Sequence, residues 1–111
     1  MKIVVAEKIS SSALGVLREP GWSVVTPEQI RDGLAAELES ADALIVRSGV
    51  QVNAGLLAKA GKLRVIGRAG VGVDNIELDP ATRQGIAVMN TPGANAVAVA
   101  EHTMAMILAM A

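Results

Sequence analysis

The chain has 111 residues, the size of one ordinary domain. Hydrophobic residues make up 51% of it and charged residues 19%, a balance that supports a packed core and excludes intrinsic disorder. The net charge of −1 argues against a broad nucleic-acid-binding surface, and the absence of cysteine excludes disulfides, thiolate metal sites and thiol nucleophiles. With one histidine and one aromatic residue, Trp22, the chain has little material for an imidazole metal centre or an aromatic flavin site.

Short β-branched runs alternate with helical segments along the chain. Ser10 or Ser11 is expected to cap the first helix, and Asn53 the third. The segment from Thr26 to Gln29 has the composition of a capping box, and apolar residues then recur at every fourth position up to residue 38. In chain order we expect strands at 3–6, 22–25, 43–46, 64–68 and 86–89, and helices at 10–18, 26–39, 53–59, 79–85 and 95–111.

This alternation predicts an α/β fold with an open, parallel, five-stranded sheet and helices on both of its faces. The last helix is unusual because apolar side chains occur on nearly all of its sides, so we expect it to be buried or to pack against a partner. The apolar run 96–111 contains Glu101 and His102 and is shorter than the roughly 20 residues of a membrane span. The N-terminus lacks a signal-peptide pattern, so a cytoplasmic protein without membrane or nucleic-acid partners is expected.

Candidate binding residues follow the strands, because ligands of open parallel sheets bind beyond the carboxyl ends of the strands. Glu7 follows the first strand, Arg47-Ser48-Gly49 the third, Arg68-Ala69-Gly70-Val71-Gly72 the fourth, and a polar segment ending at Asn95 the fifth. Guanidinium groups and glycine-rich backbone both suit anions such as phosphate or carboxylate. An ion-paired or solvated role for Arg47 and Arg68 stays open, with Asp74 as a possible counter-ion.

Two other features have simpler interpretations. The Gly70-Val71-Gly72 segment lacks the third glycine of a dinucleotide fingerprint, since Asn75 stands in that place, and we interpret it as a tight turn. Asp74 and Asn75 are expected to fix this turn through local hydrogen bonds. His102 lies in the middle of the last helix without an evident partner, so we expect a structural or interface role for it.

Three sequence segments carry a resemblance to a known family. The segments LRVIGRAGVGVDNI (63–76), NTPGAN (90–95) and AEHT (100–103) resemble the D-isomer-specific 2-hydroxyacid dehydrogenases. The segments VRS (46–48) and RAG (68–70) are similar to those of members that act on a phosphorylated substrate of the 3-phosphoglycerate type. The resemblance extends over essentially the whole chain.

The resemblance implies a flavodoxin-like substrate-binding domain and an NAD-dependent parent enzyme. Residues 1–94 would form the first segment of that domain, and 95–111 the start of a crossing helix that leads to an NAD-binding domain. The parent's substrate phosphate would be bound by Arg47, with Ser48, and Arg68. The substrate carboxylate would be held around Gly70, Val71 and Gly72, with Asn95 nearby, and Val71 would also lie close to the nicotinamide.

By the same resemblance, the family's cofactor fingerprint and its catalytic Arg, Glu and His belong to segments beyond residue 111. We therefore expect the isolated chain to bind no NAD, to be inactive as a dehydrogenase, and to self-associate as a homodimer or larger species through the apolar helix 95–111. Two alternatives stay open at this point. One is another member of the family, such as a glyoxylate or hydroxypyruvate reductase, and the other is a non-catalytic flavodoxin-like interaction module.

Overall fold

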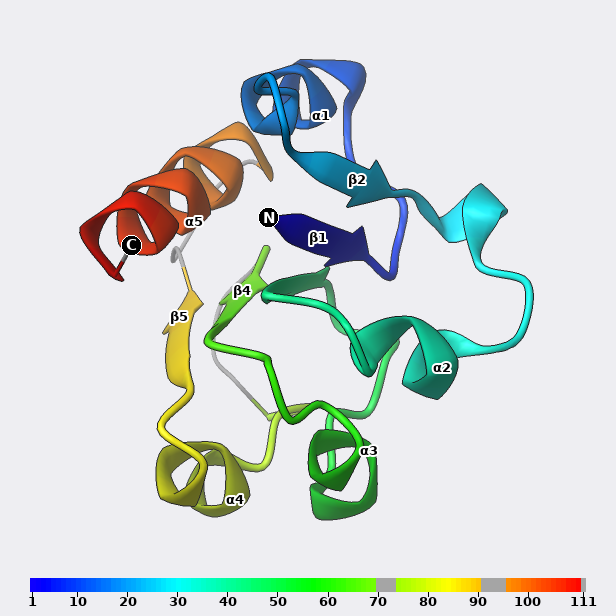
Figure 1. Ribbon diagram of the computed structural model, residues 1–111, viewed down its shortest axis with the longest axis vertical. Coiled ribbons are helices and arrows are strands. Elements are labelled where there is room, and N and C mark those ends of the chain that lie inside the picture. Colours follow the sequence, from blue (N-terminus) through cyan, green and yellow to red (C-terminus); the bar gives the residue numbers. More distant parts are fainter. Residues whose placement is uncertain (70–73, 91–95, 111) are drawn as a thin grey trace.

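The computed structural model describes residues 1–69, 74–90 and 96–110, which form one sheet covered by helices (Figure 1). The strands are β1 (Lys2–Val5), β2 (Ser23–Val25), β3 (Ala43–Val46), β4 (Val65–Arg68) and β5 (Ala87–Asn90). The helices are α1 (Ser11–Leu17), the short 3-10 turn η1 (Pro27–Gln29), α2 (Leu34–Leu38), α3 (Ala54–Ala58), α4 (Leu78–Arg83) and α5 (Ala96–Met110). The predicted α/β class and all five predicted strands are confirmed, with strand boundaries that differ by at most one residue.

The five strands are parallel and lie in the order β2-β1-β3-β4-β5. From β1 the chain moves first to β2 on one side and then to β3 on the other, so the direction of strand addition reverses between β1 and β3. In open α/β sheets this reversal point leaves a crevice beyond the carboxyl ends of the two strands, where ligands bind. The topology therefore predicts that the residues following β1 and β3 line the ligand-binding crevice.

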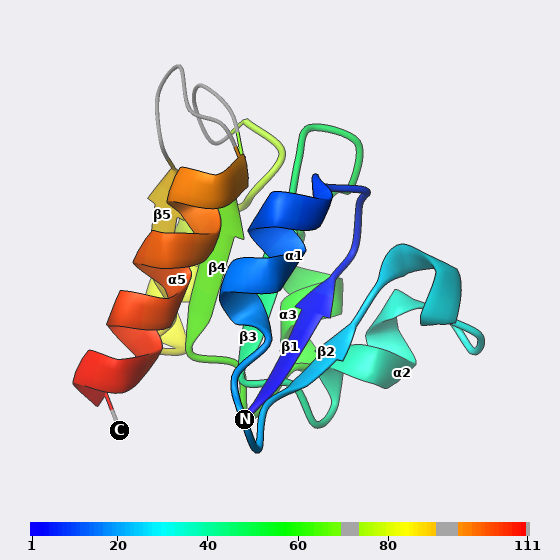
Figure 2. The same cartoon turned by 90° about the horizontal axis from the view of Figure 1, so that it is seen from above.

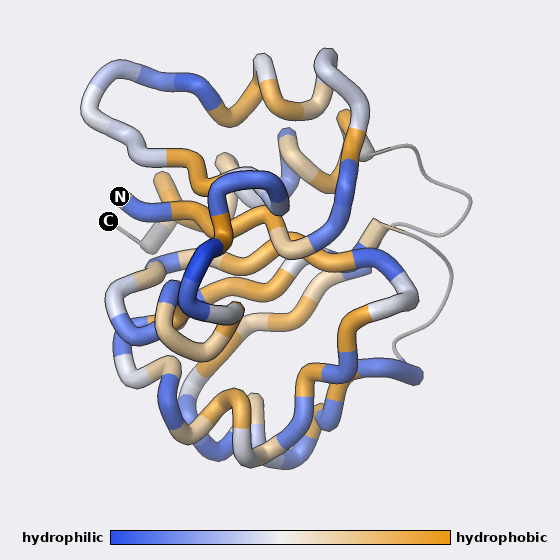
Figure 3. Tube along the Cα trace, turned by 90° about the vertical axis from the view of Figure 1, so that its right-hand side faces the viewer, coloured by the Kyte–Doolittle hydropathy of each residue, from blue (hydrophilic) through white to orange (hydrophobic). Residues whose placement is uncertain are grey.

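Alternate residues of the central strands face opposite layers of helices. Val4, Leu44 and Ile66 belong to a buried cluster with α2, α3 and α4, whereas Ile3 and Ile45 belong to a second cluster with α1 and α5. Figure 1 shows these two groups of helices on opposite sides of the sheet, and Figure 2 shows α1 and α5 side by side across one face. Because both faces are covered, the interior of the sheet is apolar, and β3 is apolar at every position; Figure 3 shows the centre of the sheet in the hydrophobic colour.

Capping residues predicted from the sequence act as expected at two helices. The Ser10 side chain accepts a hydrogen bond from the Ala13 N–H at the start of α1, and Asn53 accepts one from the Leu56 N–H at the start of α3. Both satisfy backbone donors that the first turn of a helix leaves without a partner. These interactions set the starting points of two helices that flank the sheet.

The predicted continuous helix at 26–39 is wrong. The capping box forms, with the Thr26 N–H donating to Gln29 Oε1 at 2.9 Å, but it starts only the 3-10 turn η1. The chain then becomes extended at Ile30, which ends η1, and Gly33, with a φ of +93°, is the N-cap from which α2 begins. Such a positive φ is readily adopted only by glycine, so Gly33 divides the apolar stripe into two short helical pieces.

Helix α5 approaches β4 closely at Gly67. A Cβ added to this glycine would lie 2.7 Å from Oγ1 of Thr103 and 3.0 Å from Cγ1 of Val99, both on α5. A larger residue at position 67 would push α5 away from the sheet.

Within the described part of the chain, no helix combines the length and apolar character that crossing a bilayer requires.

Candidate functional site

The carboxyl edge of the sheet brings together three of the residues that the sequence nominated. Arg47 and Ser48 directly follow β3, and both are exposed. Arg68 is the last residue of β4, pairs in register with Val46 of β3, and is only 8% exposed. The two arginines thus end neighbouring strands but have different surroundings, because one side chain reaches solvent and the other is buried.

Asn75 connects these two strand ends through a buried side chain. Its Oδ1 accepts a hydrogen bond from Nε of Arg68, and its Nδ2 donates to the carbonyl oxygens of Arg47 at 2.7 Å and Val50 at 2.8 Å. Both polar atoms of the amide therefore have partners, as a polar side chain at 6% exposure requires. Two partners of Asn75 lie 25 and 28 residues away along the chain, so this side chain makes long-range bonds. The expected local bonds to the glycine turn concern residues 70–73, which lie outside the described residues.

Backbone contacts reinforce the connection that Asn75 makes. The Val52 N–H donates to the Asn75 carbonyl at 2.7 Å, and the Glu77 N–H donates to the Val52 carbonyl at 2.9 Å. Val52 and Ile76 form an isolated parallel bridge there. The segment after β3 is consequently held against residues 75–77 by both main-chain and side-chain hydrogen bonds.

Glu7, two residues beyond β1, binds the loop after β3 from the other side. Its Oε2 accepts a hydrogen bond from the Arg47 N–H, and its Oε1 accepts one from the Gly49 N–H at 2.8 Å. The Arg47 side chain makes a long contact in the same direction, from Nη1 to the Lys8 carbonyl oxygen at 3.5 Å. The sequence placed Glu7 at this edge but gave no sign of its partners, which lie 40 and 42 residues further on.

Four of the predicted site residues, Gly70, Val71, Gly72 and Asn95, lie outside the described residues. The residues from 74 onward nevertheless include the position of the third glycine of a dinucleotide fingerprint and the helix that follows it. Asn75, which stands in the position of the third glycine, is hydrogen-bonded to the loop that follows β3. The next helix, α4, begins only at Leu78 and has six residues. A fingerprint needs a glycine-rich turn that opens directly into a helix. The described residues do not form such a site.

The other residues that the sequence singled out lie away from this edge or have structural contacts. His102 is exposed on α5, and Ser10 acts as a helix cap. Among the described residues, no group of three or more His, Asp or Glu side chains is arranged to hold a metal ion. Neither residue therefore joins the arginines in a common site.

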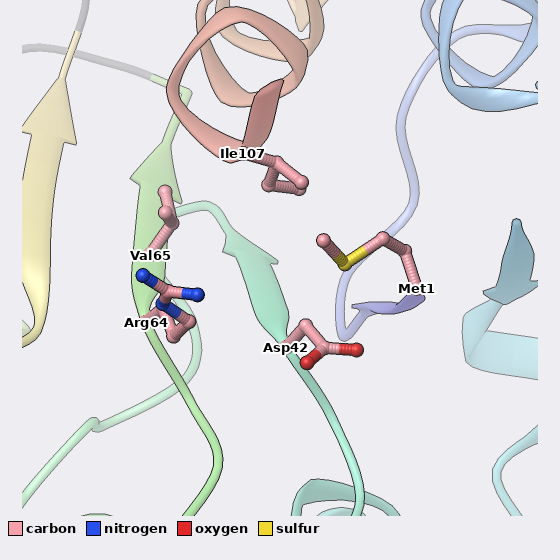
Figure 4. A pocket seen from close by; sticks show the side chains of 5 residues that line it. All are labelled: Met1, Asp42, Arg64, Val65 and Ile107. Carbon is pink, nitrogen blue, oxygen red and sulfur yellow. The ribbon is translucent and has the colours of Figure 1, made fainter. Parts of the chain in front are cut away.

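The opposite, amino edge of the sheet has a different character. Figure 4 shows Asp42 and Arg64 beside the side chains of Met1, Val65 and Ile107. The hollow that these five residues line measures only about 10 Å³, room for a single water at most. Asp42 accepts a hydrogen bond from the Lys2 N–H at 2.9 Å, so its carboxylate extends the β1–β3 ladder. This hollow offers no space for an organic ligand.

The geometry of the carboxyl edge is suited to anion recognition. It presents one solvent-accessible guanidinium, Arg47, and one hydroxyl, Ser48, on a loop whose backbone is held by Glu7 and Asn75. Arg47 is a strong donor for carboxylate or phosphate oxygens, and a rigid loop lowers the entropy lost on binding. An exposed cation such as Arg47 pairs with an anion but performs no bond-breaking chemistry by itself.

A family comparison defines the class of protein. The model of the D-isomer specific 2-hydroxyacid dehydrogenase catalytic domain matches residues 3–107. The match covers nearly all of the described strands and of α5. The chain therefore belongs to the D-isomer specific 2-hydroxyacid dehydrogenase family, and the resemblance seen in the sequence is confirmed.

Individual relatives narrow the assignment within that family. The chain is 45% identical over 112 residues to D-3-phosphoglycerate dehydrogenase of Archaeoglobus fulgidus, and 41% identical over 111 residues to D-3-phosphoglycerate dehydrogenase of Homo sapiens. These alignments cover 100% and 99% of this chain but 21% of each relative, so the chain spans about a fifth of their length. A crystal structure of NAD+-bound 3-phosphoglycerate dehydrogenase from Entamoeba histolytica superimposes with a TM-score of 0.70 and 33% identity, over 84% of this chain and 33% of that one.

Proposed function

We propose that this chain is the substrate-binding portion of a cytoplasmic, NAD-dependent D-3-phosphoglycerate dehydrogenase. That enzyme oxidises 3-phosphoglycerate to 3-phosphohydroxypyruvate in serine biosynthesis. Residues 1–94 would form the first segment of the substrate domain, and 95–111 the start of the helix that leads to an NAD-binding domain. NAD itself would be held by the part of the relatives' length that this chain does not span.

One observation carries the proposal. The exposed guanidinium of Arg47 lies at the carboxyl end of β3, beside the point where strand addition reverses, on a loop held by hydrogen bonds from two sides. We assign the substrate phosphate to Arg47 and Ser48, with Arg68 contributing from the buried end of β4. Gly70, Val71, Gly72 and Asn95 are proposed to bind the substrate carboxylate, with Val71 close to the nicotinamide.

Calorimetric titration of the 111-residue chain with 3-phosphoglycerate tests this assignment. We expect binding with a dissociation constant on the order of 1 mM, and an Arg47→Ala variant about tenfold weaker, because it loses a charge-assisted contact to the phosphate. Glycerate, which lacks the phosphate, is expected to bind more weakly and without dependence on Arg47. Arg18→Ala is the matched control, since Arg18 is exposed at the far end of α1 and its removal changes the net charge equally.

The titration also distinguishes the alternatives. Equal binding of glycerate and 3-phosphoglycerate, with no effect of Arg47→Ala, would favour a family member with a non-phosphorylated substrate, such as a glyoxylate or hydroxypyruvate reductase. Absence of binding by the folded chain would overturn the proposal that this portion binds substrate alone and would favour an interaction module.

We also propose that the isolated chain self-associates through α5. Ile107 is buried against the sheet, but Leu108, on the next position of the helix, is 61% exposed. A groove beside α1 and α5 adjoins Leu108; its lining includes apolar Val16 and Met104 and is flanked by Glu19 and Glu101. Covering an exposed leucine stabilises an interface by about 1.5–3 kcal/mol, which supports a homodimer or larger species.

A further inference from the structure

The loop that carries Arg47 is organised by a carboxylate from another part of the chain. Glu7 is the acceptor for two N–H groups of this loop, those of Arg47 and Gly49. Hydrogen bonds to an ionised acceptor are stronger than neutral ones, and two of them at residues i and i+2 define the loop's curvature. Glu7 is half-buried and reaches this loop from the end of the neighbouring strand, β1.

Gly49 shows that the position of the carboxylate is built into the loop. A Cβ on Gly49 would overlap Oε1 of Glu7, and among the described residues beyond its chain neighbours no other side chain comes within 4 Å of that Cβ. The φ of Gly49 is not positive, so an alanine there is not excluded by the backbone conformation. The carboxylate of Glu7 is therefore the one group among the described residues that requires glycine at position 49.

The contacts of Glu7 also determine which groups the loop presents to a ligand. The N–H groups of Arg47 and Gly49 donate to Glu7, and the carbonyl of Arg47 accepts from Asn75. The backbone around Arg47 is thereby committed to internal partners. The side chains of Arg47 and Ser48 extend from a main chain that is fixed on both sides.

We propose that Glu7 is a positioning residue for anion binding: its carboxylate holds the Arg47–Gly49 loop in the conformation in which Arg47 meets the substrate phosphate. This inference rests on the proposed function and extends it to a residue that does not touch the substrate. Without Glu7 the loop backbone has to be ordered when the ligand binds, and that cost reduces affinity.

The test is a double-mutant cycle on the 111-residue chain, read by calorimetry with 3-phosphoglycerate and with glycerate. We expect Glu7→Ala to weaken 3-phosphoglycerate binding about tenfold, the equivalent of ordering about one backbone residue, and to leave glycerate binding within about twofold. Gly49→Ala should produce a similar loss by displacing the carboxylate. The double variant should be no weaker than Glu7→Ala alone, because the new methyl group at position 49 then has no carboxylate to displace.

Three further measurements separate positioning from general damage. Glu39→Ala removes the same charge at an exposed site after α2 and should leave both affinities unchanged. In NMR spectra, Glu7→Ala should move the amide signals of Arg47 and Gly49 more than any others near the loop. A Glu7→Gln variant keeps one acceptor oxygen and should restore part of the lost affinity.

Each outcome has a separate meaning. If Arg47→Ala abolishes the preference for 3-phosphoglycerate but Glu7→Ala does not, the positioning role is wrong and the proposed function stands. Tighter binding by Glu7→Ala would also overturn the inference, because Glu7 would then compete with the ligand for the loop's N–H groups. If the unmodified chain shows no preference for the phosphorylated ligand, the proposed function itself fails, and the positioning role fails with it.

Discussion

Replacing Asn75 by alanine should destabilise the whole chain, because this side chain joins the ends of β3 and β4. The change removes the acceptor for Arg68 Nε and the donor for the carbonyls of Arg47 and Val50. A hydrogen bond to a charged group contributes about 1.5–3 kcal/mol and a neutral one about 0.5–1.5 kcal/mol. We expect a loss of about 3 kcal/mol, near the lower end of the sum of these contributions.

Urea unfolding followed by circular dichroism measures this loss. With a slope of about 1–3 kcal/mol per molar urea, the midpoint should fall by about 1–3 M while the slope stays constant. Gln51→Ala is the matched control, since Gln51 is an exposed amide in the same loop, and its midpoint should hardly change. Asn75→Asp should be nearly as damaging as Asn75→Ala, because it keeps the acceptor for Arg68 but puts negative oxygen against two carbonyls. Equal midpoints for Asn75→Ala and Gln51→Ala would show that the Asn75 side chain does not hold the two strand ends together.

Three further predictions concern α5. Gly67→Ala should lower the free energy of unfolding in urea by about 1–3 kcal/mol, because its Cβ would lie 2.7 Å from Oγ1 of Thr103. Gly61→Ala is the control: a Cβ there meets open space, so the free energy should change by less than about 0.5 kcal/mol. Equal effects of the two variants would contradict the close packing of α5 on β4. Thr103→Val should raise the melting temperature by several degrees, since Oγ1 of Thr103 is buried without a hydrogen-bond partner among the described residues. A lower melting temperature would show that the hydroxyl makes a stabilising hydrogen bond. Leu108→Gln should lower the mass measured by light scattering towards that of the monomer, and an unchanged mass would exclude Leu108 from the interface.

The layered fold was predictable because its determinants are local. Apolar runs such as 43–46 identify buried strands, and the side chains of Ser10 and Asn53 bind N–H groups only three residues away. The one error of element type came from interpreting the apolar stripe after Thr26 as one helix. The stripe has helical spacing, but a left-handed glycine at position 33 interrupts it, and periodicity does not report backbone dihedrals.

The candidate site was predictable only in part. Residue type and the rule that ligands lie at carboxyl ends of strands were sufficient to nominate Arg47 and Arg68. The partners of Glu7 and Asn75 were not predictable, because their hydrogen bonds join residues from 25 to 42 positions apart. The order of the strands, with β1 between β2 and β3, brings those residues together, and it is decided by tertiary packing rather than by local pattern.

The most direct test of the proposed substrate site is to map where 3-phosphoglycerate binds. Amide signals of an isotopically labelled 111-residue chain would be followed during the titration, with glycerate as the comparison ligand. We predict shifts at the carboxyl edge, centred on Arg47 and Ser48 and extending to Arg68, and no shifts at Asp42 or Arg64 on the opposite edge. Shifts centred on the amino edge, or a pattern that does not depend on the phosphate group, would contradict the assignment of the phosphate to Arg47.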